Sequence, residues 1–206
     1  MLKIWGRLTS VNVQKVVWCA DELGLEYERI EAGGKYGVVT TPQYLAMNPN
    51  ALVPVIEEDG FVLWESNAIV RYLAARHGAG TLWATDASLR ADADRWMDWQ
   101  TTTFNPAIGP AFWQLIRTAP EKRDAGVIET ARASGEKYLA VLDAHLATRD
   151  FVAGSAFTMG DIPVGCSVDR WYKLPLARAS HPHVERWYQA LRGRKGATQV
   201  VELALS

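Results

Sequence analysis

The segment from Asn48 to Ala74, NPNALVPVIEEDGFVLWESNAIVRYLA, constrains the fold of this chain more than any other. Two apolar runs, 53–56 and 61–64, read as short strands, and Glu58-Asp59-Gly60 between them is typical of a hairpin turn. Pro54 has no N–H to donate, so it belongs on a strand edge or at a break, where a cis bond is one option. The sequence therefore predicts a β-hairpin with an irregular proline turn at its entrance.

A helix is predicted directly after this hairpin. Ala68, Ile69, Tyr72 and Leu73 recur at helical spacing, and Glu65-Ser66-Asn67 offers acceptors to the first free amides. A carboxylate and a hydroxyl at a helix start can hold a small zwitterion, and the same residues also serve as ordinary helix caps. The residues alone leave both interpretations open.

The size and charge of the chain exclude several classes of protein. With 206 residues it can form one large domain or two small ones, with a sizeable core. A formal net charge of -1 gives no electrostatic reason to bind nucleic acid or an anionic membrane. The apolar runs are too short to span a bilayer, and the N-terminal residues do not resemble a signal peptide. We therefore expect a cytoplasmic protein without a nucleic-acid or membrane partner.

The cysteines and histidines do not form a disulfide or metal pattern. Cys19 and Cys166 are far apart, no CxxC spacing occurs, and the histidines are scattered. A disulfide is not expected in a reducing compartment, and zinc has no ligand set, so no metal is predicted. Cys19 falls on the central turns of a predicted helix and is expected to be buried and inert.

The N-terminal segment predicts a β-α-β opening. Residues 2–5 read as a strand, 13–23 as a helix with one apolar face, and 27–30 as a second strand. The turn before the helix carries Thr9-Ser10-Val11-Asn12, which has hydroxyls and an amide but no cysteine. Such groups at a helix start can stabilise a thiolate that a ligand brings in. Ser10 can also be only the N-cap of this helix.

Strand signals almost vanish beyond the hairpin and its helix. Residues 78–86 read as a linker, and helices are predicted over 88–103 and 128–148. Pro106 and Pro110 are expected to break or kink the continuation of the first of these helices. The expected fold class is therefore α/β followed by an all-α part.

Thr158 and Asp161 have the spacing of a capping box. The apolar residues Ile162, Pro163 and Val164 follow directly, so the box is predicted to open a buried helix. We expect both of its residues to be structural and not catalytic.

In spacing and order, these features resemble the glutathione transferase superfamily, and in particular a bacterial-type member with a serine or threonine site, similar to the theta-like classes. The resemblance implies a thioredoxin-like, glutathione-binding domain over 1–78 and an all-α domain over 86–206 that contributes the hydrophobic substrate pocket. It also implies glutathione as co-substrate, a homodimer and a role in detoxification.

The resemblance assigns a catalytic role to the turn before the first helix. The hydroxyl that holds the glutathione sulfur as a thiolate falls on Ser10, and Asn12 matches an asparagine that assists in some bacterial members. Thr9 replaces Ser10 in this role if the register is shifted by one residue.

The resemblance also implies how glutathione is held along the hairpin. Glu65 and Ser66 are expected to bind the γ-glutamyl end, because its ammonium needs a carboxylate and its carboxylate suits a hydroxyl and free amides. The backbone of Val53, next to Pro54, is expected to pair with the cysteinyl amide as an added strand would.

One position departs from the pattern of the superfamily. Many relatives carry Lys, Arg or Gln immediately before the Val-Pro pair, whereas this chain has Leu52. The glycyl carboxylate of glutathione must then find another donor, for which Lys35 and Gln43 are the candidates.

A pocket for a hydrophobic electrophile is expected between the two domains. Its predicted walls come from the loop after the first strand and from the helix that runs past residue 100, with Trp171 or Tyr172 as further candidates. The residues assigned to it are Leu8, Phe104, Phe112 and Trp113.

The expected activity is that of a glutathione transferase, in which the sulfur attacks the electrophile. A glutathione-dependent reductase of peroxides or mixed disulfides is an alternative, because the same thiolate supports it. A binding protein of the same fold without catalytic activity is the alternative from a different class.

Overall fold

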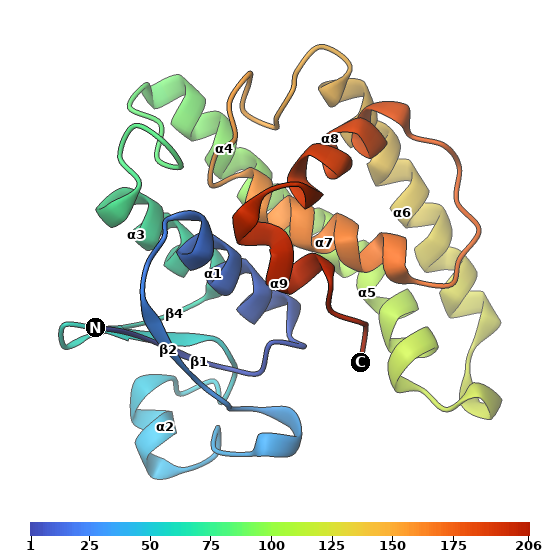
Figure 1. Ribbon diagram of the computed structural model, residues 1–206. Helices are drawn as coiled ribbons and strands as arrows, with labels where there is room; N and C mark the ends of the chain where they lie inside the picture. Colours follow the sequence, from blue (N-terminus) through green and yellow to red (C-terminus); the bar gives the residue numbers. More distant parts are fainter.

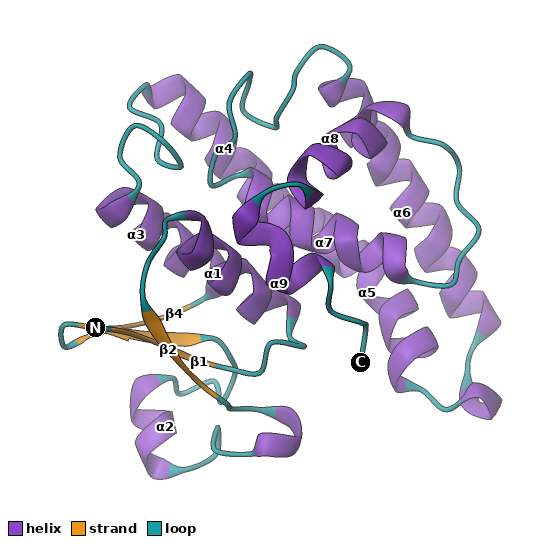
Figure 2. Ribbon diagram, viewed as in Figure 1, coloured by secondary structure: helices purple, strands orange, loops and turns teal.

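Four short strands form one mixed sheet in the computed structural model, which describes residues 1–206 (Figure 2). β1 pairs in parallel with β2 and antiparallel with β3, and β3 pairs antiparallel with β4. Asp59 and Gly60 both have positive φ, as a two-residue hairpin turn requires. The hairpin is therefore confirmed. The strands, in their order across the sheet, are β2 (Tyr27–Ile30), β1 (Leu2–Trp5), β3 (Val55–Glu58) and β4 (Phe61–Trp64).

Helices cover both faces of this sheet. Helices α1 (Val11–Glu22) and α3 (Ser66–His77) pack side by side on one face, and α2 (Pro42–Met47) lies on the other (Figure 1). Val13, Val16 and Val17 of α1 are fully buried, as its apolar periodicity predicts. The thioredoxin-like arrangement of the N-terminal domain is confirmed.

The rest of the chain is helical and forms the second domain (Figures 1 and 2). Helix α7 runs through its middle and packs directly against α1 of the first domain. The helices are α4 (Ala87–Trp99), α5 (Asn105–Phe112), α6 (Ala125–Leu146), α7 (Asp161–Lys173), α8 (Pro182–Arg192) and α9 (Thr198–Val201), with short 3-10 turns at Gly34–Tyr36, Pro120–Lys122 and Lys195–Ala197.

The two prolines do not end the helix that follows the linker. The chain continues as a π-helix over Gln100–Phe104, as α5, and as a second π-helix over Trp113–Arg117. Pro106 lies in the first turn of α5, directly after the first π-helix, and Pro110 lies inside α5. Of the two predicted effects, a break or a kink, the break does not occur, because helical structure continues past both rings with a π segment on either side of α5.

The domains share one hydrophobic core. Gly165 of α7 is the point of close approach, because a Cβ there would lie 2.7 Å from Leu191 Cδ1 and 3.2 Å from Trp18 Cη2. Trp18 belongs to α1, so the small residue lets the central helix of the second domain meet the first. A single cluster of buried hydrophobic residues includes members of both domains, from Leu2 in the first to Val200 in the second.

Asp161 is fully buried at the start of α7 and accepts four hydrogen bonds. The donors are the backbone N–H groups of Val152 and Thr158, each at 2.9 Å, Trp187 Nε1 at 2.9 Å and Thr158 Oγ1 at 3.3 Å. The Thr158 amide bond to Asp161 is the reciprocal bond of a capping box. Asp161 therefore ties three separate segments together, as its predicted structural role requires.

Both cysteines are fully buried and free. Burial raises the pKa of the Cys19 and Cys166 thiols above their ordinary value. No group of three His, Cys, Asp or Glu side chains is placed to hold a metal ion. No helix combines the length and the hydrophobicity that crossing a membrane requires.

Candidate active site

The turn between β1 and α1 brings Ser10 to the mouth of a helix. Gly6 has a φ of 151°, and a Cβ at this position would overlap Val13 Cγ2, so only glycine lets the strand turn so sharply. Ser10 N–H then donates to the carbonyl of Arg7 at 3.1 Å, and the carbonyl of Ser10 accepts the first helical bond, from Gln14. Ser10 is the N-cap residue of α1.

The Ser10 hydroxyl does not act as a capping group. Although Ser10 has extended N-cap backbone angles, its side chain makes no hydrogen bond to the helix or to any other protein group. The side chain is half-buried, as are those of Thr9 and Asn12. A donor therefore stands free where the first amides of α1 are also unpaired, and this place favours an anion.

The entrance of the hairpin leaves backbone groups without partners. The Val53–Pro54 peptide bond is cis, and β3 begins only at Val55. The N–H and C=O of Val53 make no hydrogen bond within the protein, whereas the carbonyl of Leu52 accepts from Tyr44 Oη and Asn48 Nδ2, each at 2.8 Å. An extended peptide can pair with Val53 without breaking any existing bond.

Glu65 and Ser66 begin α3 in an unusual conformation. Glu65 has a φ of 72°, in the left-handed region that non-glycine residues rarely adopt, and such strain is characteristic of functional sites. Its carboxylate is exposed and has no ion-pair or hydrogen-bond partner in the protein. Ser66 is buried, with its Oγ 3.4 Å from Lys15 Nζ. An acceptor and a hydroxyl thus stand side by side at a helix start.

Two hollows meet at Asn12, Glu65 and Ser66. The larger, of about 370 Å³, extends between α3 and the second domain and reaches Gln100 and Asn105. The smaller follows the loop from Asn48 to Pro54. Asn12 belongs to the start of α1, whereas Glu65 and Ser66 belong to the start of α3. The structure therefore brings the α1 turn and the α3 turn together. Ser10 and Thr9 are not among the residues that line either hollow.

Lys15 lies on the floor of the larger hollow and is almost completely buried. Its Nζ donates to Gln100 Oε1 at 2.9 Å and Asn67 Oδ1 at 3.2 Å, in addition to Ser66. All three acceptors are neutral, and burial lowers the pKa of Lys15 to about 8. This ammonium therefore connects α1, the start of α3 and the π-helix of the second domain.

The depressed pKa of Lys15 predicts a dependence of stability on pH. The folded pKa is about 8 and the ordinary value is 10.5, so between these values the unfolded chain keeps a proton that the folded protein has lost. Raising the pH through this range therefore favours folding, by about 2 to 3 kcal/mol. Urea unfolding of the wild type and Lys15→Met across this range should show the wild type gaining this amount relative to the variant. A constant difference would contradict the assignment.

The candidates for the glycyl carboxylate of glutathione lie apart from these hollows. Lys35 is exposed, with its Nζ 5.1 Å from the centre of the Tyr36 ring, and Gln43 is exposed on α2. Leu52 is 64% exposed at the rim of the smaller hollow, where Asn48 and Asn50 also contribute walls. The part played by Lys35 stays a prediction.

The residues predicted for the electrophile pocket fall into different environments. Phe104 is fully buried and stacks on Trp99 with ring centres 5.2 Å apart, so it belongs to the core and offers no surface to a ligand. Leu8 is half-buried, and Phe112 is nearly buried, in edge contact with Trp113. Trp113 is 63% exposed. The sequence pattern had no means of separating the aromatic residues of the core from those near the surface. Trp171 is also fully buried.

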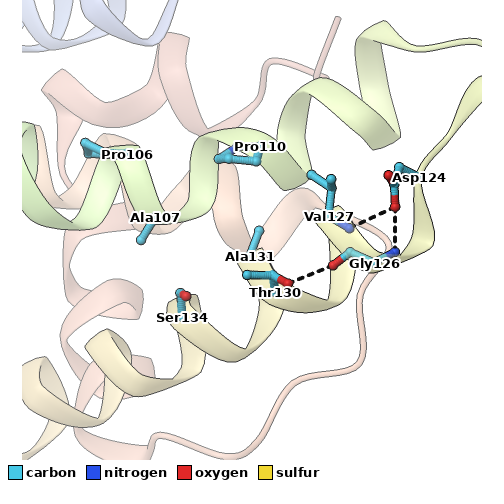
Figure 3. A pocket seen from close by; sticks show the side chains of 9 residues that line it. All are labelled: Pro106, Ala107, Pro110, Asp124, Gly126, Val127, Thr130, Ala131 and Ser134. Atoms are coloured by element: carbon cyan, nitrogen blue, oxygen red, sulfur yellow. Dashed lines mark hydrogen bonds between the residues drawn. The ribbon is translucent and has the colours of Figure 1, made fainter.

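A further hollow lies between α5 and α6 and shares no residue with the two above (Figure 3). Figure 3 shows that its walls are mostly small or apolar residues, such as Pro106, Pro110 and Ala131. Asp124 caps α6 by accepting from the Gly126 and Val127 amides, so its carboxylate is already engaged. This groove holds no set of groups that suggests catalysis.

Several polar residues of the site were not predicted from the sequence. Asn67 was expected only to offer an acceptor to the first amides of its helix, and Gln100 was given no role in the site, yet the structure buries both around Lys15. Asn48 and Asn50 were read only as a turn, and the Asn-Pro-Asn motif was the one available signal for them. The burial of Lys15 follows from packing between domains, which helical periodicity does not encode.

A thioredoxin-like domain with a free hydroxyl in place of redox cysteines, joined to a helical domain, agrees with the arrangement that the resemblance to glutathione transferases implies. Residues 1–75 match the family model of the glutathione S-transferase N-terminal domain, and residues 104–195 match that of the C-terminal domain. Glutathione S-transferase GstB of Escherichia coli, strain K12, is 40% identical over 208 residues, which cover 100% of both chains. The chain belongs to the glutathione S-transferase family.

Further relatives agree with this assignment. The theta class glutathione S-transferase of Xanthomonas axonopodis pv. citri, solved with glutathione bound, superposes with a TM-score of 0.96 and 43% identity, covering 100% of this chain and 99% of that chain. Glutathione S-transferase 3 of Zea mays is 31% identical over 211 residues, which cover 97% of this chain and 93% of the maize protein.

Proposed function

We propose that this protein transfers glutathione to an electrophile and that Ser10 holds the glutathione sulfur as a thiolate. The observation that carries the proposal is the Ser10 hydroxyl, which stands at the mouth of α1 without any protein partner. A hydroxyl that served only as a helix cap would bond to the amides of the first turn. Asn12, two residues further on and at the junction of both hollows, supplies a second polar group near the sulfur.

The rest of glutathione is proposed to follow the free groups of the first domain. Its cysteinyl unit pairs with the N–H and C=O of Val53, beside Pro54, and its γ-glutamyl end reaches the start of α3. There the ammonium meets the Glu65 carboxylate, and the carboxylate meets Ser66 and the free helix amides. Lys35 is our candidate for the glycyl carboxylate.

Activation of the thiol is within reach of these groups. A free thiol has a pKa near 8.5, so only a few per cent is ionised at neutral pH. One charge-assisted hydrogen bond contributes about 1.5 to 3 kcal/mol, and one pKa unit corresponds to about 1.4 kcal/mol. The Ser10 hydroxyl and the helix end together therefore lower the pKa of the bound thiol enough to make the thiolate a major species.

The proposal is tested by titrating the purified protein with glutathione while recording thiolate absorbance in the ultraviolet. Turnover is then measured with an activated aryl halide, a hydroperoxide and a mixed disulfide. We expect thiolate formation near neutral pH and turnover of the aryl halide. Turnover of only the hydroperoxide or disulfide identifies a reductase, and binding without any turnover identifies a binding protein of this fold.

Removing the charge of Glu65 is expected to weaken glutathione binding. Glu65→Gln keeps an acceptor but loses the attraction for the γ-glutamyl ammonium, so the Kd should rise by roughly tenfold, equivalent to about 1.4 kcal/mol. Calorimetric titration measures this change, with the exposed Glu129→Gln on α6 as the control. Equal Kd values for the wild type and Glu65→Gln would remove Glu65 from the site.

We also propose that the glutathione-binding domain spans residues 1–78 and the all-α domain residues 86–206. The protein is further proposed to be a homodimer in the cytoplasm with a role in detoxification. The edge strand β4 supports the homodimer, because it exposes the large apolar side chains Phe61 and Trp64. Phe61→Glu is expected to shift the protein toward monomers in analytical ultracentrifugation, since it places a charge on this exposed apolar edge strand. A control change at Leu89, an exposed leucine outside the sheet, should leave the mass unchanged.

A further inference from the structure

Two arginine side chains lie on the same aromatic ring in the second domain. Arg170 of α7 places its Cζ 4.2 Å from the centre of the Phe112 ring, and Arg117, at the end of the π-helix, places its Cζ 5.6 Å from the same centre. Phe112 is nearly buried beneath them. Like charges repel at this range, so their convergence on one ring is not explained by the cation–π attraction alone.

A third arginine, Arg7 of the first domain, lies close enough to this pair for their charges to repel. Arg7 precedes Ser10 in the turn after β1, and its side chain passes beside Gly33, where a built Cβ would lie 2.9 Å from Arg7 Nη1. Burial, and then the charge of Arg117, lowers the pKa of Arg7. Burial lowers the pKa of Arg170 to about 10, and repulsion by Arg117 and Arg7 contributes to this change. We call Arg7, Arg117 and Arg170 the arginine cluster.

No carboxylate of the protein forms an ion pair with the arginine cluster, although the charge of Asp169 acts on Arg170 from further away. None of its three side chains donates a hydrogen bond or forms an ion pair within the protein. The neighbouring acid on α7, Asp169, is already held by Lys173 at 2.7 Å and Tyr188 at 2.6 Å. By contrast, seven other arginines have a carboxylate partner: Arg29, Arg71, Arg76, Arg95, Arg132, Arg186 and Arg194.

The arginine cluster adjoins the proposed sulfur site. The carbonyl of Arg7 accepts the N–H of Ser10, so the first arginine opens the turn that carries the proposed thiolate donor. The charge of Arg170 also acts on Lys15 one helical turn further along α1, where it adds to the effect of burial. The cluster therefore joins residues of both domains, and one of its members belongs to the same turn as Ser10.

We propose that the arginine cluster binds an anionic group of the electrophile, so that the second substrate is an organic acid, such as a carboxylate or sulfonate, whose apolar body packs near Phe112 and Leu8. Guanidinium groups bind carboxylates and sulfonates through parallel N–H···O bonds, and three of them without a counter-ion favour an anion strongly. This inference rests on the proposed transferase function and defines its substrate class more narrowly than a neutral hydrophobic compound.

The reaction with such a substrate needs no further reactant. With a chloro-dinitrobenzoate, the glutathione sulfur forms a bond to the ring carbon that carries chlorine. The carbon–chlorine bond breaks, and chloride leaves with the bonding electron pair. The thiol proton passes to solvent, and nothing is oxidised or reduced. The carboxylate stays on the ring throughout, where it can remain bound to the arginine cluster.

The test compares a chloro-dinitrobenzoate with the benzamide of the same ring substitution. After division by the uncatalysed rate constants, kcat/KM of the wild type should favour the benzoate by about tenfold or more. Arg117→Met should reduce this preference by about tenfold while changing the benzamide value less than about twofold, and Arg117 is exposed, so its replacement is compatible with folding. Arg170→Met should act in the same direction. Arg192→Met, which removes an arginine from the Tyr188 ring on α8, is the matched control.

Each other outcome overturns the inference in a distinguishable way. An equal fall for both substrates makes the arginines structural. A rise in the Kd of glutathione by the same factor as the fall for the benzoate assigns them to the glycyl carboxylate of glutathione. Efficient turnover of the benzamide without preference for the benzoate refutes the anionic substrate class alone, whereas no turnover of either compound refutes the proposed transferase function as well.

Discussion

Replacing Ser10 with alanine is expected to lower kcat/KM for an aryl halide by about 10- to 100-fold at neutral pH. The variant loses one charge-assisted hydrogen bond to the thiolate, of about 1.5 to 3 kcal/mol, and each 1.4 kcal/mol is a factor of ten. The pKa of bound glutathione should rise toward that of a free thiol, so the loss should shrink as the pH is raised. Glutathione affinity should change little, because Ser10 is proposed to bond only the sulfur.

The measurement is the pH profile of kcat/KM together with the thiolate absorbance of bound glutathione. Ser10→Thr keeps a hydroxyl and should restore most of the activity, and Thr9→Ala tests the neighbouring hydroxyl. If Ser10→Ala titrates like the wild type while Thr9→Ala loses the thiolate, the catalytic role belongs to Thr9. If neither variant changes the profile, the thiolate is stabilised elsewhere.

Removing the carboxylate of Asp161 is expected to destabilise the protein by about 4 kcal/mol. Asp161→Ala leaves the buried donors of Val152, Thr158 and Trp187 unpaired, and each such donor costs about 1 to 3 kcal/mol. Urea unfolding measures the loss. Asp161→Asn keeps one acceptor oxygen and should show a smaller loss, which gives a measurable result if the alanine variant does not fold.

The control for Asp161 is a carboxylate on the surface. Asp150 is 67% exposed and pairs with Arg186 at 3.0 Å, so Asp150→Ala should cost less than about 1 kcal/mol. Comparable losses at both positions would contradict the view that burial makes Asp161 important. Unchanged glutathione affinity in folded Asp161→Asn would support its purely structural role.

The strands and the hairpin follow from the sequence because their signals are local. Leu2–Trp5 and Phe61–Trp64 are strands over the predicted residues, bounded by a glycine on one side or the other. Strand β3 begins two residues later than predicted, because Val53 and Pro54 stay outside the ladder. The helical path past Pro110 was not predictable. It includes a π-helix over Gln100–Phe104, in which Phe104 packs against Trp99, and such packing is not visible in the sequence.

The part of the candidate site that a short sequence motif encodes could be predicted from the sequence. Glu65 and Ser66 lie together with Asn12 as expected, because the α1 turn and the α3 turn belong to the same sheet edge. The arginine cluster draws on three segments that are far apart in the sequence, and periodicity within a single helix contains no information about their meeting. The same is true of Lys15, whose acceptors come from both domains.

The ammonium group of Lys15 binds acceptors from both domains, and this affects whether the two domains can be separated. Its acceptors Ser66 and Asn67 belong to the first domain, and Gln100 belongs to the second, so separating the halves removes an oxygen from a cation in the middle of the fold. We therefore expect the two halves to unfold as one cooperative unit. A chimera with a different helical half should therefore need a hydrogen-bond acceptor at the position of Gln100. Without it, the buried Lys15 ammonium would lose a partner beneath the larger hollow.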